Sequence, residues 1–253
     1  MAESVLEQIV GKTRMELELR KQKIPADIFN LEGATRSLKK ALTSAKGNAV
    51  ITEIKPASPS QGDLRELDAA KVARDMEAGG AAAISVLTEP FYFQGSLENL
   101  RRAKDATSIP IMRKDFIVDE YQLLEARHYG ADAVLLMVAV LGEETKAFYE
   151  KTRNLGMEAL VELHGTEELD IALSSGAEII GINNRNLVDL SVDLNTTKDL
   201  ARKIPKGRII ISESGVKTRE GLDFVLKYAD AALVGTSLMR ADDIKKAVEE
   251  LVR

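Results

Sequence analysis

Short apolar segments recur along the chain at intervals typical of buried β-strands. We predict eight strands, at residues 49–54, 82–87, 109–112, 133–137, 159–161, 179–182, 209–212 and 231–234. The intervening segments carry apolar residues at helical spacing, and four of them close on a glycine just before the next apolar run. Glycine past a helix end adopts the left-handed conformation without a Cβ penalty. The pattern therefore predicts alternating strands and helices, as in repeated βαβ units.

Polar side chains gather at the carboxyl ends of five predicted strands. They are Glu53 with Lys55, Arg113-Lys114-Asp115, Glu162, Asn183-Asn184-Arg185 and Glu213-Ser214-Gly215. A buried parallel strand is apolar along its length, so charges confined to one end need a separate reason. In a (β/α)8 barrel these ends form one rim, and the active site lies there. The sequence therefore predicts the α/β class and a single (β/α)8 TIM barrel with a functional rim.

The residues before the first strand are not needed for a barrel. We expect an N-terminal helical extension over residues 1–48, packed on a barrel of residues 49–253, in a single domain overall. Residues 4–21 and 34–44 have apolar positions at helical spacing, so each segment predicts a helix. Two placements are open. The helices either plug the barrel bottom or pack on its side, or they cover the open rim and help to enclose a substrate.

Composition and charge exclude several classes of protein. The chain has 253 residues, of which 45% are hydrophobic and 30% charged, and its net charge is −5. This charge and the lack of basic clusters argue against nucleic-acid binding. No apolar run reaches the roughly 18–20 residues that span a membrane, and the N-terminus shows no signal-peptide core. We therefore expect a cytoplasmic enzyme and, because no long apolar stripe is left over, a monomer.

The reactive residue types are few. The chain has no cysteine, which excludes disulfides, a thiolate nucleophile and a cysteine-bound metal. Its two histidines, His128 and His164, are far apart in sequence and form no metal-binding pattern. We expect a structural role for His128, which falls in a predicted helix. His164 lies just past Glu162 near the rim, and we expect it to stay outside the site.

Glu53 and Lys55 are two residues apart at the end of the first strand, so their side chains share one face with Ile51. If that face is the barrel interior, an acid and a base enter the mouth together. The alternative is a strand-end salt bridge that faces solvent. Buried Glu and Lys are rare unless they are paired or functional, which favours the mouth.

Lys114 directly follows the third predicted strand, and alternation places it on the opposite face from Arg113 and Asp115. We expect Arg113 and Asp115 to form an ordinary ion pair on the helix side. A crowded, cationic rim is expected to lower the pKa of Lys114, which would make it a proton donor near neutral pH. Glu162 ends its own strand as a lone carboxylate, which suggests a base or a hydrogen-bond acceptor.

The last two units carry small residues that are typical of phosphate binding. Ser214-Gly215 follows the seventh strand, and Gly235-Thr236-Ser237 follows the eighth. Small residues let the backbone approach a ligand closely, and a helix N-terminus offers N–H groups to an anion. The loops after strands seven and eight are the usual phosphate site of these barrels.

Five stretches together resemble the indole-3-glycerol-phosphate synthase family. They are residues 53–60 (EIKPASPS), 113–116 (RKDF), 181–187 (GINNRNL), 212–215 (SESG) and 235–240 (GTSLMR). The resemblance implies closure of 1-(2-carboxyphenylamino)-1-deoxyribulose 5-phosphate to indole-3-glycerol phosphate, with release of CO₂ and water, in tryptophan biosynthesis. It implies a small-molecule phosphosugar–anthranilate substrate and no metal or organic cofactor.

The resemblance also implies roles for individual residues. Lys114 resembles the general acid that protonates the substrate carbonyl, and Lys55 the lysine that holds the anthranilate carboxylate. Glu53 and Glu162 resemble carboxylates that assist ring closure and dehydration, in an order that the sequence leaves open. Asn183 and Glu213 resemble polar residues around the sugar hydroxyls. The phosphate-binding set corresponds to Ser58, Ser214, Gly215, Gly235 and Thr236, and the apolar wall around the aromatic ring to Phe93, Phe116, Leu135 and Leu187.

Two alternatives remain at this point. Another phosphosugar isomerase barrel would use a Cys/Asp pair or strand-end aspartates, which Glu53 and Glu162 do not match. A non-catalytic phosphate-binding barrel would keep the Gly-Thr-Ser loop but would have no reason to retain Lys55, Lys114 and Glu162 together.

Overall fold

The computed structural model describes residues 4–58, 62–63 and 68–253, with only the backbone at Ser58 and Asp63. Its strands are β1 (Val50–Ile54), β2 (Ala57–Ser58), β3 (Gly62–Asp63), β4 (Ala83–Leu87), β5 (Ile111–Lys114), β6 (Ala133–Met137), β7 (Glu158–Leu163), β8 (Ile179–Asn183), β9 (Ile209–Glu213) and β10 (Ala231–Val234).

The helices alternate with the strands along the chain. The α-helices are α1 (Val5–Lys23), α2 (Leu38–Thr43), α3 (Ala69–Ala78), α4 (Leu97–Ala106), α5 (Glu120–His128), α6 (Val138–Leu141), α7 (Thr145–Asn154), α8 (Leu169–Ser174), α9 (Asn195–Ala201), α10 (Arg219–Val225), α11 (Thr236–Met239) and α12 (Ile244–Val252). Three short 3-10 turns are η1 (Ala26–Ile28), η2 (Gly142–Glu144) and η3 (Thr166–Glu168). Within the described ranges, no helix is long and apolar enough to cross a membrane.

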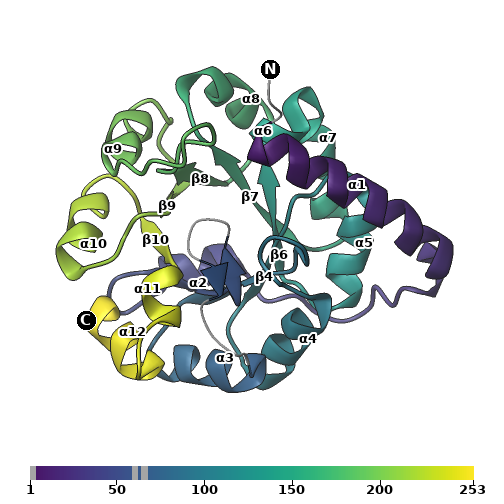
Figure 1. The fold of residues 1–253 in the computed structure, drawn as a ribbon. Coiled ribbons are helices and arrows are strands. Elements are labelled where there is room, and N and C mark those ends of the chain that lie inside the picture. The colour runs from purple at the N-terminus through teal and green to yellow at the C-terminus, as the bar shows by residue number, and fades with distance from the viewer. Residues whose placement is uncertain (1–3, 59–61, 64–67) are drawn as a thin grey trace.

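The predicted barrel is confirmed. Eight parallel strands close on themselves in the order β1-β10-β9-β8-β7-β6-β5-β4, and the helices form a ring around them (Figure 1). The short strands β2 and β3 form a separate antiparallel pair. Glycines with positive φ stand between helix and strand as the sequence predicts, at Gly80, Gly130, Gly156 and Gly176. There the left-handed backbone lets the chain reverse from the outer ring into the barrel.

The strands differ from the predicted segments mainly at their ends. β5 begins two residues late because Pro110 has no N–H to give to the ladder, although its carbonyl accepts the Ile84 N–H at 3.0 Å. At the other end, β5 and β7 run on through Lys114 and Glu162, which pair in register with Leu87 and Met137. The polar residues therefore lie within the strands, and the rigid ladder positions their side chains.

Alternation along each strand divides the buried residues into two cores. On β6, Val134 and Leu136 pack toward the helices, whereas Ala133, Leu135 and Met137 pack inside the barrel. The other strands follow the same rule with a period of two residues. At the carboxyl end of a strand, a residue an even number of positions from an inner-core residue therefore points its side chain into the barrel mouth.

Each N-terminal helix occupies one of the two placements that the sequence left open. Leu38 and Leu42 of α2 pack into the inner core together with Ile51 near the start of β1, so α2 plugs the barrel bottom. Residues of α1 instead line the cavity at the opposite end, so α1 covers part of the rim. α2 is shorter than the predicted helix because Ser37 is its N-cap, accepting a hydrogen bond from the Lys40 N–H at 3.0 Å.

Candidate active site

A cavity of about 540 Å³ opens at the carboxyl ends of the barrel strands. All but two of the site residues that the sequence nominates line this cavity. The lining residues are Glu53, Lys55, Phe93, Lys114, Phe116, Leu135, Glu162, Asn183, Leu187, Ser214, Gly215, Gly235 and Thr236. Of the remaining two, Glu213 is fully buried and reaches the cavity through Lys114. The Ser58 side chain lies outside the described residues.

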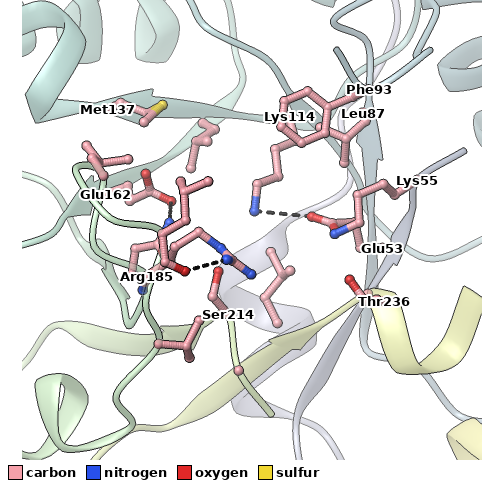
Figure 2. Close-up of a pocket in the computed structure, with 18 of the residues that line it drawn as sticks. Glu53, Lys55, Leu87, Phe93, Lys114, Met137, Glu162, Arg185, Ser214 and Thr236 are labelled. Atoms are coloured by element: carbon pink, nitrogen blue, oxygen red, sulfur yellow. Dashed lines mark hydrogen bonds and ion pairs between the residues drawn. The ribbon is translucent and has the colours of Figure 1, made fainter. Parts of the chain in front are cut away.

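Three charged groups meet on one side of this cavity. The Lys55 Nζ lies 2.6 Å from Glu53 Oε1, and the Lys114 Nζ lies 3.1 Å from Glu53 Oε2 (Figure 2). A second carboxylate oxygen, Glu213 Oε2, lies 3.1 Å from the same Lys114 Nζ. Glu53 is 2% exposed, which rules out the solvent-facing salt bridge. β1 and β5 thus deliver two ammonium groups and one carboxylate to the same point of the mouth.

The expected lowering of the Lys114 pKa is wrong. Burial would lower the pKa of Lys114, but the carboxylates of Glu53, Glu213 and Glu162 raise it above the ordinary value. The neighbouring cation Arg113 does not counter them, because its side chain points away toward α5 and bonds to Asp115 and Glu125. The rim around Lys114 is acidic, and its ammonium is held charged.

The pKa values of Glu53 and Glu213 shift in opposite directions, although both carboxyl groups contact Lys114. Burial would raise the pKa of Glu53, but Lys114 and Lys55 together hold it down at about 2. Burial raises the pKa of Glu213 to about 8, and the nearby Glu162 carboxylate adds to the rise that Lys114 opposes. Glu53 is therefore a fixed negative charge, whereas Glu213 can hold a proton near neutral pH.

Glu162 faces these groups from the other side of the cavity (Figure 2). Its Oε2 accepts a hydrogen bond from Asn183 Nδ2 at 3.0 Å, and its side chain is almost fully buried. Asn183 belongs to β8, where its register partner is Glu213 on β9. Glu162 thus lies across the cavity from a charged lysine and beside the Glu213 carboxyl, an arrangement suited to moving protons on opposite sides of a ligand.

An apolar wall lies beside Lys114. The rings of Phe93 and Phe116 lie with centroids 6.1 Å apart. Two buried carboxylates fix the backbone at these two phenylalanines. Glu89 accepts the Phe93 N–H at 3.0 Å, and Asp115 accepts the Phe116 N–H at 2.8 Å. With Leu135 and Leu187, which line the same cavity, these rings form a surface that suits an aromatic group.

The two predicted phosphate loops lie together at the cavity. Ser214 adopts a positive φ of 64°, which is uncommon outside glycine, and the Asn184 Nδ2 donates to the Ser214 carbonyl at 3.0 Å. Gly215 follows with a φ of 92°, and Gly235 immediately precedes the short helix α11. Their binding of phosphate stays a prediction.

Gly235 has a second role that the sequence does not show. A Cβ at this position would lie 2.9 Å from the Glu53 Cβ and 3.0 Å from its Cδ, and would collide with Glu53 Oε1. The glycine therefore leaves room for the Glu53 side chain. Substitutions at Gly235 will disturb this carboxylate as well as any anion that the loop holds.

Sequence reasoning placed Arg185 at the rim but gave it no role in the site. Arg185 lines the cavity, and its Nη1 donates to the Leu190 carbonyl at 2.8 Å. His164 lies outside the cavity lining, in line with our expectation, but its Nε2 is 3.4 Å from Glu162 Oε1. Both could have been found, because each follows a site residue, Asn183 or Glu162, by two positions and alternation turns both members of such a pair to the same face.

Comparison with known sequences agrees across the chain. The sequence profile of the family described as "Indole-3-glycerol phosphate synthase" matches residues 6–251. A protein of that name from Methanocaldococcus jannaschii is 46% identical over 98% of this chain and 98% of its own length. Another from Campylobacter jejuni subsp. doylei is 45% identical over 98% of this chain and 100% of its own.

Solved structures agree on the fold alone. A thiamine phosphate pyrophosphorylase from Pyrococcus furiosus superposes with a TM-score of 0.61 at 19% identity, covering 82% of this chain and 94% of that one. An N-acetylmannosamine-6-phosphate 2-epimerase from Clostridium perfringens gives a TM-score of 0.63 at 18% identity, covering 85% and 98%. At this level of identity the likeness speaks for the barrel and not for the chemistry.

Proposed function

The chain belongs to the indole-3-glycerol phosphate synthase family, and from that premise we propose that the cavity at the strand ends is its active site. The protein is a decarboxylating lyase of tryptophan biosynthesis. Its reaction closes 1-(2-carboxyphenylamino)-1-deoxyribulose 5-phosphate to indole-3-glycerol phosphate and releases CO₂ and water. The substrate therefore carries a phosphate, a carboxylate, an aromatic ring and a carbonyl group, each of which needs its own place in the cavity.

Lys114 is the general acid of the ring closure. Its ammonium reaches into the cavity between Glu53 and Glu213, next to the aromatic wall, and this is the observation that carries the proposal. Because surrounding carboxylates raise the pKa of Lys114, the donor enters each turnover charged. As the ring carbon attacks, the carbonyl oxygen becomes an alkoxide, a stronger base than the amine, and it then takes the proton.

The other polar residues divide the remaining work. Lys55 holds the substrate carboxylate until CO₂ leaves, and Glu53 keeps both lysines in position through contacts of 2.6 and 3.1 Å. Glu162 works from the opposite side as the proton acceptor for dehydration. Asn183 meets the sugar hydroxyls beside Glu162, and the buried Glu213 acts on this region through its contact with Lys114.

The substrate's two ends are held by different chemistry. The ring packs between Phe93, Phe116, Leu135 and Leu187, which are apolar and exclude water. The phosphate lies against Ser214, Gly215, Gly235 and Thr236, with Ser58 as a further ligand. Support for this placement comes from the shared lining of one cavity and from the positive φ of Ser214 and Gly215. The enzyme needs no metal or organic cofactor for these steps.

We further propose that the enzyme works in the cytoplasm as a monomer. The large apolar side chains that remain exposed, such as Met15, Ile28 and Val188, are distributed over separate segments. Light scattering after size exclusion tests the oligomeric state, and a mass near twice the 27.7 kDa of one chain would contradict it.

The product itself gives the most direct test of the activity. The chain contains no tryptophan, so the protein itself adds only weak tyrosine fluorescence to the signal of an indole product. The protein is mixed with the carboxyanilino-deoxyribulose phosphate in buffer that contains a metal chelator. We expect indole fluorescence to rise and CO₂ to form in equal amount. If no indole forms from a well-folded protein, the proposed function fails.

A further inference from the structure

His164 lies directly behind Glu162, outside the residues that line the cavity. It follows Glu162 by two positions at the end of β7, so both side chains lie on the same face of the chain. Its Nε2 is 3.4 Å from Glu162 Oε1, and its Nδ1 is 3.5 Å from Glu168 Oε2. The imidazole therefore stands between two carboxylates, one in the active site and one on the neighbouring turn η3.

Both oxygens of Glu162 need a partner because the side chain is buried. Asn183 supplies one for Oε2. Among the described residues, Oε1 and the nearby Glu213 Oε1 make no hydrogen bond, and neither does either ring nitrogen of His164. An unsatisfied buried carboxylate oxygen is costly, and a donor already stands at ion-pair distance from it. The pair is thus placed to form a charge-assisted hydrogen bond with a small movement of either side chain.

Glu168 fixes the histidine from the other side. Its Oε2 accepts the backbone N–H of His164 at 2.7 Å, the same oxygen that faces Nδ1. The backbone and the ring are thereby tied to one carboxylate. The His164 side chain is 9% exposed, so little solvent competes for its nitrogens.

We propose that His164 is a positioning residue for Glu162, and that it holds the carboxylate in the orientation that the reaction requires. This inference rests on the proposed role of Glu162. His164 does not touch substrate, and Glu168 orients its ring much as an acidic residue orients a catalytic imidazole. Of His164 and Glu162, only Glu162 exchanges a proton with the substrate.

The charges around the ring support this role. Burial would lower the pKa of His164, but the carboxylates of Glu162 on β7, Glu168 on η3 and Glu213 on β9 raise it above the ordinary value. The imidazole consequently keeps its positive charge to higher pH than an exposed histidine. A charged imidazole is the stronger hydrogen-bond donor to the Glu162 carboxylate.

Three variants measured for kcat and KM test the proposal. His164→Leu removes both the donor and the charge, and we expect kcat to fall about tenfold or more with KM within about twofold. His164→Gln keeps a donor and should recover part of kcat. His128→Gln is the matched control and should change neither quantity, since His128 stacks on Phe29 far from the cavity lining.

A double variant separates this role from simple packing. If His164 acts through Glu162, His164→Leu should cost nothing further in a Glu162→Gln background. Independent, additive losses, or a folded His164→Leu protein with unchanged kcat, would overturn the proposal. Failure of the underlying function is distinguishable, because Glu162→Gln would then itself retain normal kcat or the wild type would form no indole. Circular dichroism confirms folding of every variant, and His164→Gln remains the test if His164→Leu does not fold.

Discussion

Arg113 and Lys114 are adjacent cations on β5, and each is surrounded by carboxylates. Arg113 points toward α5, where its Nη2 lies 2.8 Å from Asp115 Oδ2 and its Nη1 donates to the Gln122 carbonyl at 2.7 Å. Lys114 points into the barrel mouth, between Glu53 and Glu213. Both are charged, but only Lys114 borders an open cavity.

The difference shows how one strand serves structure and chemistry at once. The guanidinium is 0% exposed and bonded to Thr88, Asp115, Gln122 and Glu125, so no group in that cluster is left for a ligand. The ammonium is a compact charge with carboxylates on one side and free space on the other. A saturated cluster holds the fold together, and an unsaturated one can bind and move protons.

Removing Arg113 should have the largest effect on stability. Arg113→Met leaves Asp115 buried without its cation and Glu125 with Arg20 alone. Breaking a buried ion pair in this way typically costs about 3–5 kcal/mol. Urea unfolding followed by circular dichroism measures this loss, and activity per folded molecule should stay near wild type. A variant as stable as wild type would show that the Arg113 cluster is not structural.

A substitution that crowds Glu53 tests whether the cluster around Lys114 serves catalysis. Gly235→Ala places a Cβ where Glu53 packs, so both lysine contacts of that carboxylate should shift. We expect kcat/KM to fall about tenfold or more, with a loss in kcat as well as in KM. Thr236→Ala, one residue on, is the matched control and should have a smaller effect. A loss confined to KM would mean that Gly235 serves only the phosphate.

The two clusters can also be compared by removing one carboxylate from each cation. Glu213→Gln removes a carboxylate from Lys114, and Glu125→Gln removes one from Arg113. We expect the first to lower kcat and the second to lower mainly the free energy of unfolding. Equal effects of both on kcat, measured at saturating substrate, would erase the distinction between the clusters.

Glu213 should also leave a signature in the pH dependence of stability. Burial holds its pKa at about 8 in the folded protein against an ordinary value of 4.5. Between these values the folded state binds an extra proton, so this group's contribution is fully present below pH 4.5 and is lost as the pH rises to 8. Relative to wild type, Glu213→Gln should therefore gain at least about 1 kcal/mol of stability from pH 5 to pH 8. A constant difference across that range would contradict the raised pKa.

Periodicity alone predicts much of this arrangement. The alternation of Arg113 and Lys114 between two faces follows from the two-residue repeat of a strand. The gathering of Glu53, Glu162 and Glu213 at one rim follows from the barrel, because all parallel strands end there. These inferences need only the order of residues and the fold class.

The remainder depends on distances between strands that are remote in sequence. A cationic rim is what the sequence leads one to expect, yet carboxylates from β1, β7 and β9 surround Lys114. The crowding of Gly235 against Glu53 is likewise a contact between β1 and the loop after β10. Sequence reveals which face a side chain takes, but the sign of a pKa shift depends on which charges meet across the barrel.

The central claim is that Lys114, held charged by these carboxylates, donates the proton in ring closure. Lys114→Ala tests it most directly, with substrate binding titrated separately from turnover and folding checked by circular dichroism. The account predicts a fall in kcat of roughly 10²-fold or more while the substrate still binds, the size expected for a lost general acid. Turnover within a few-fold of wild type would contradict the assignment of Lys114.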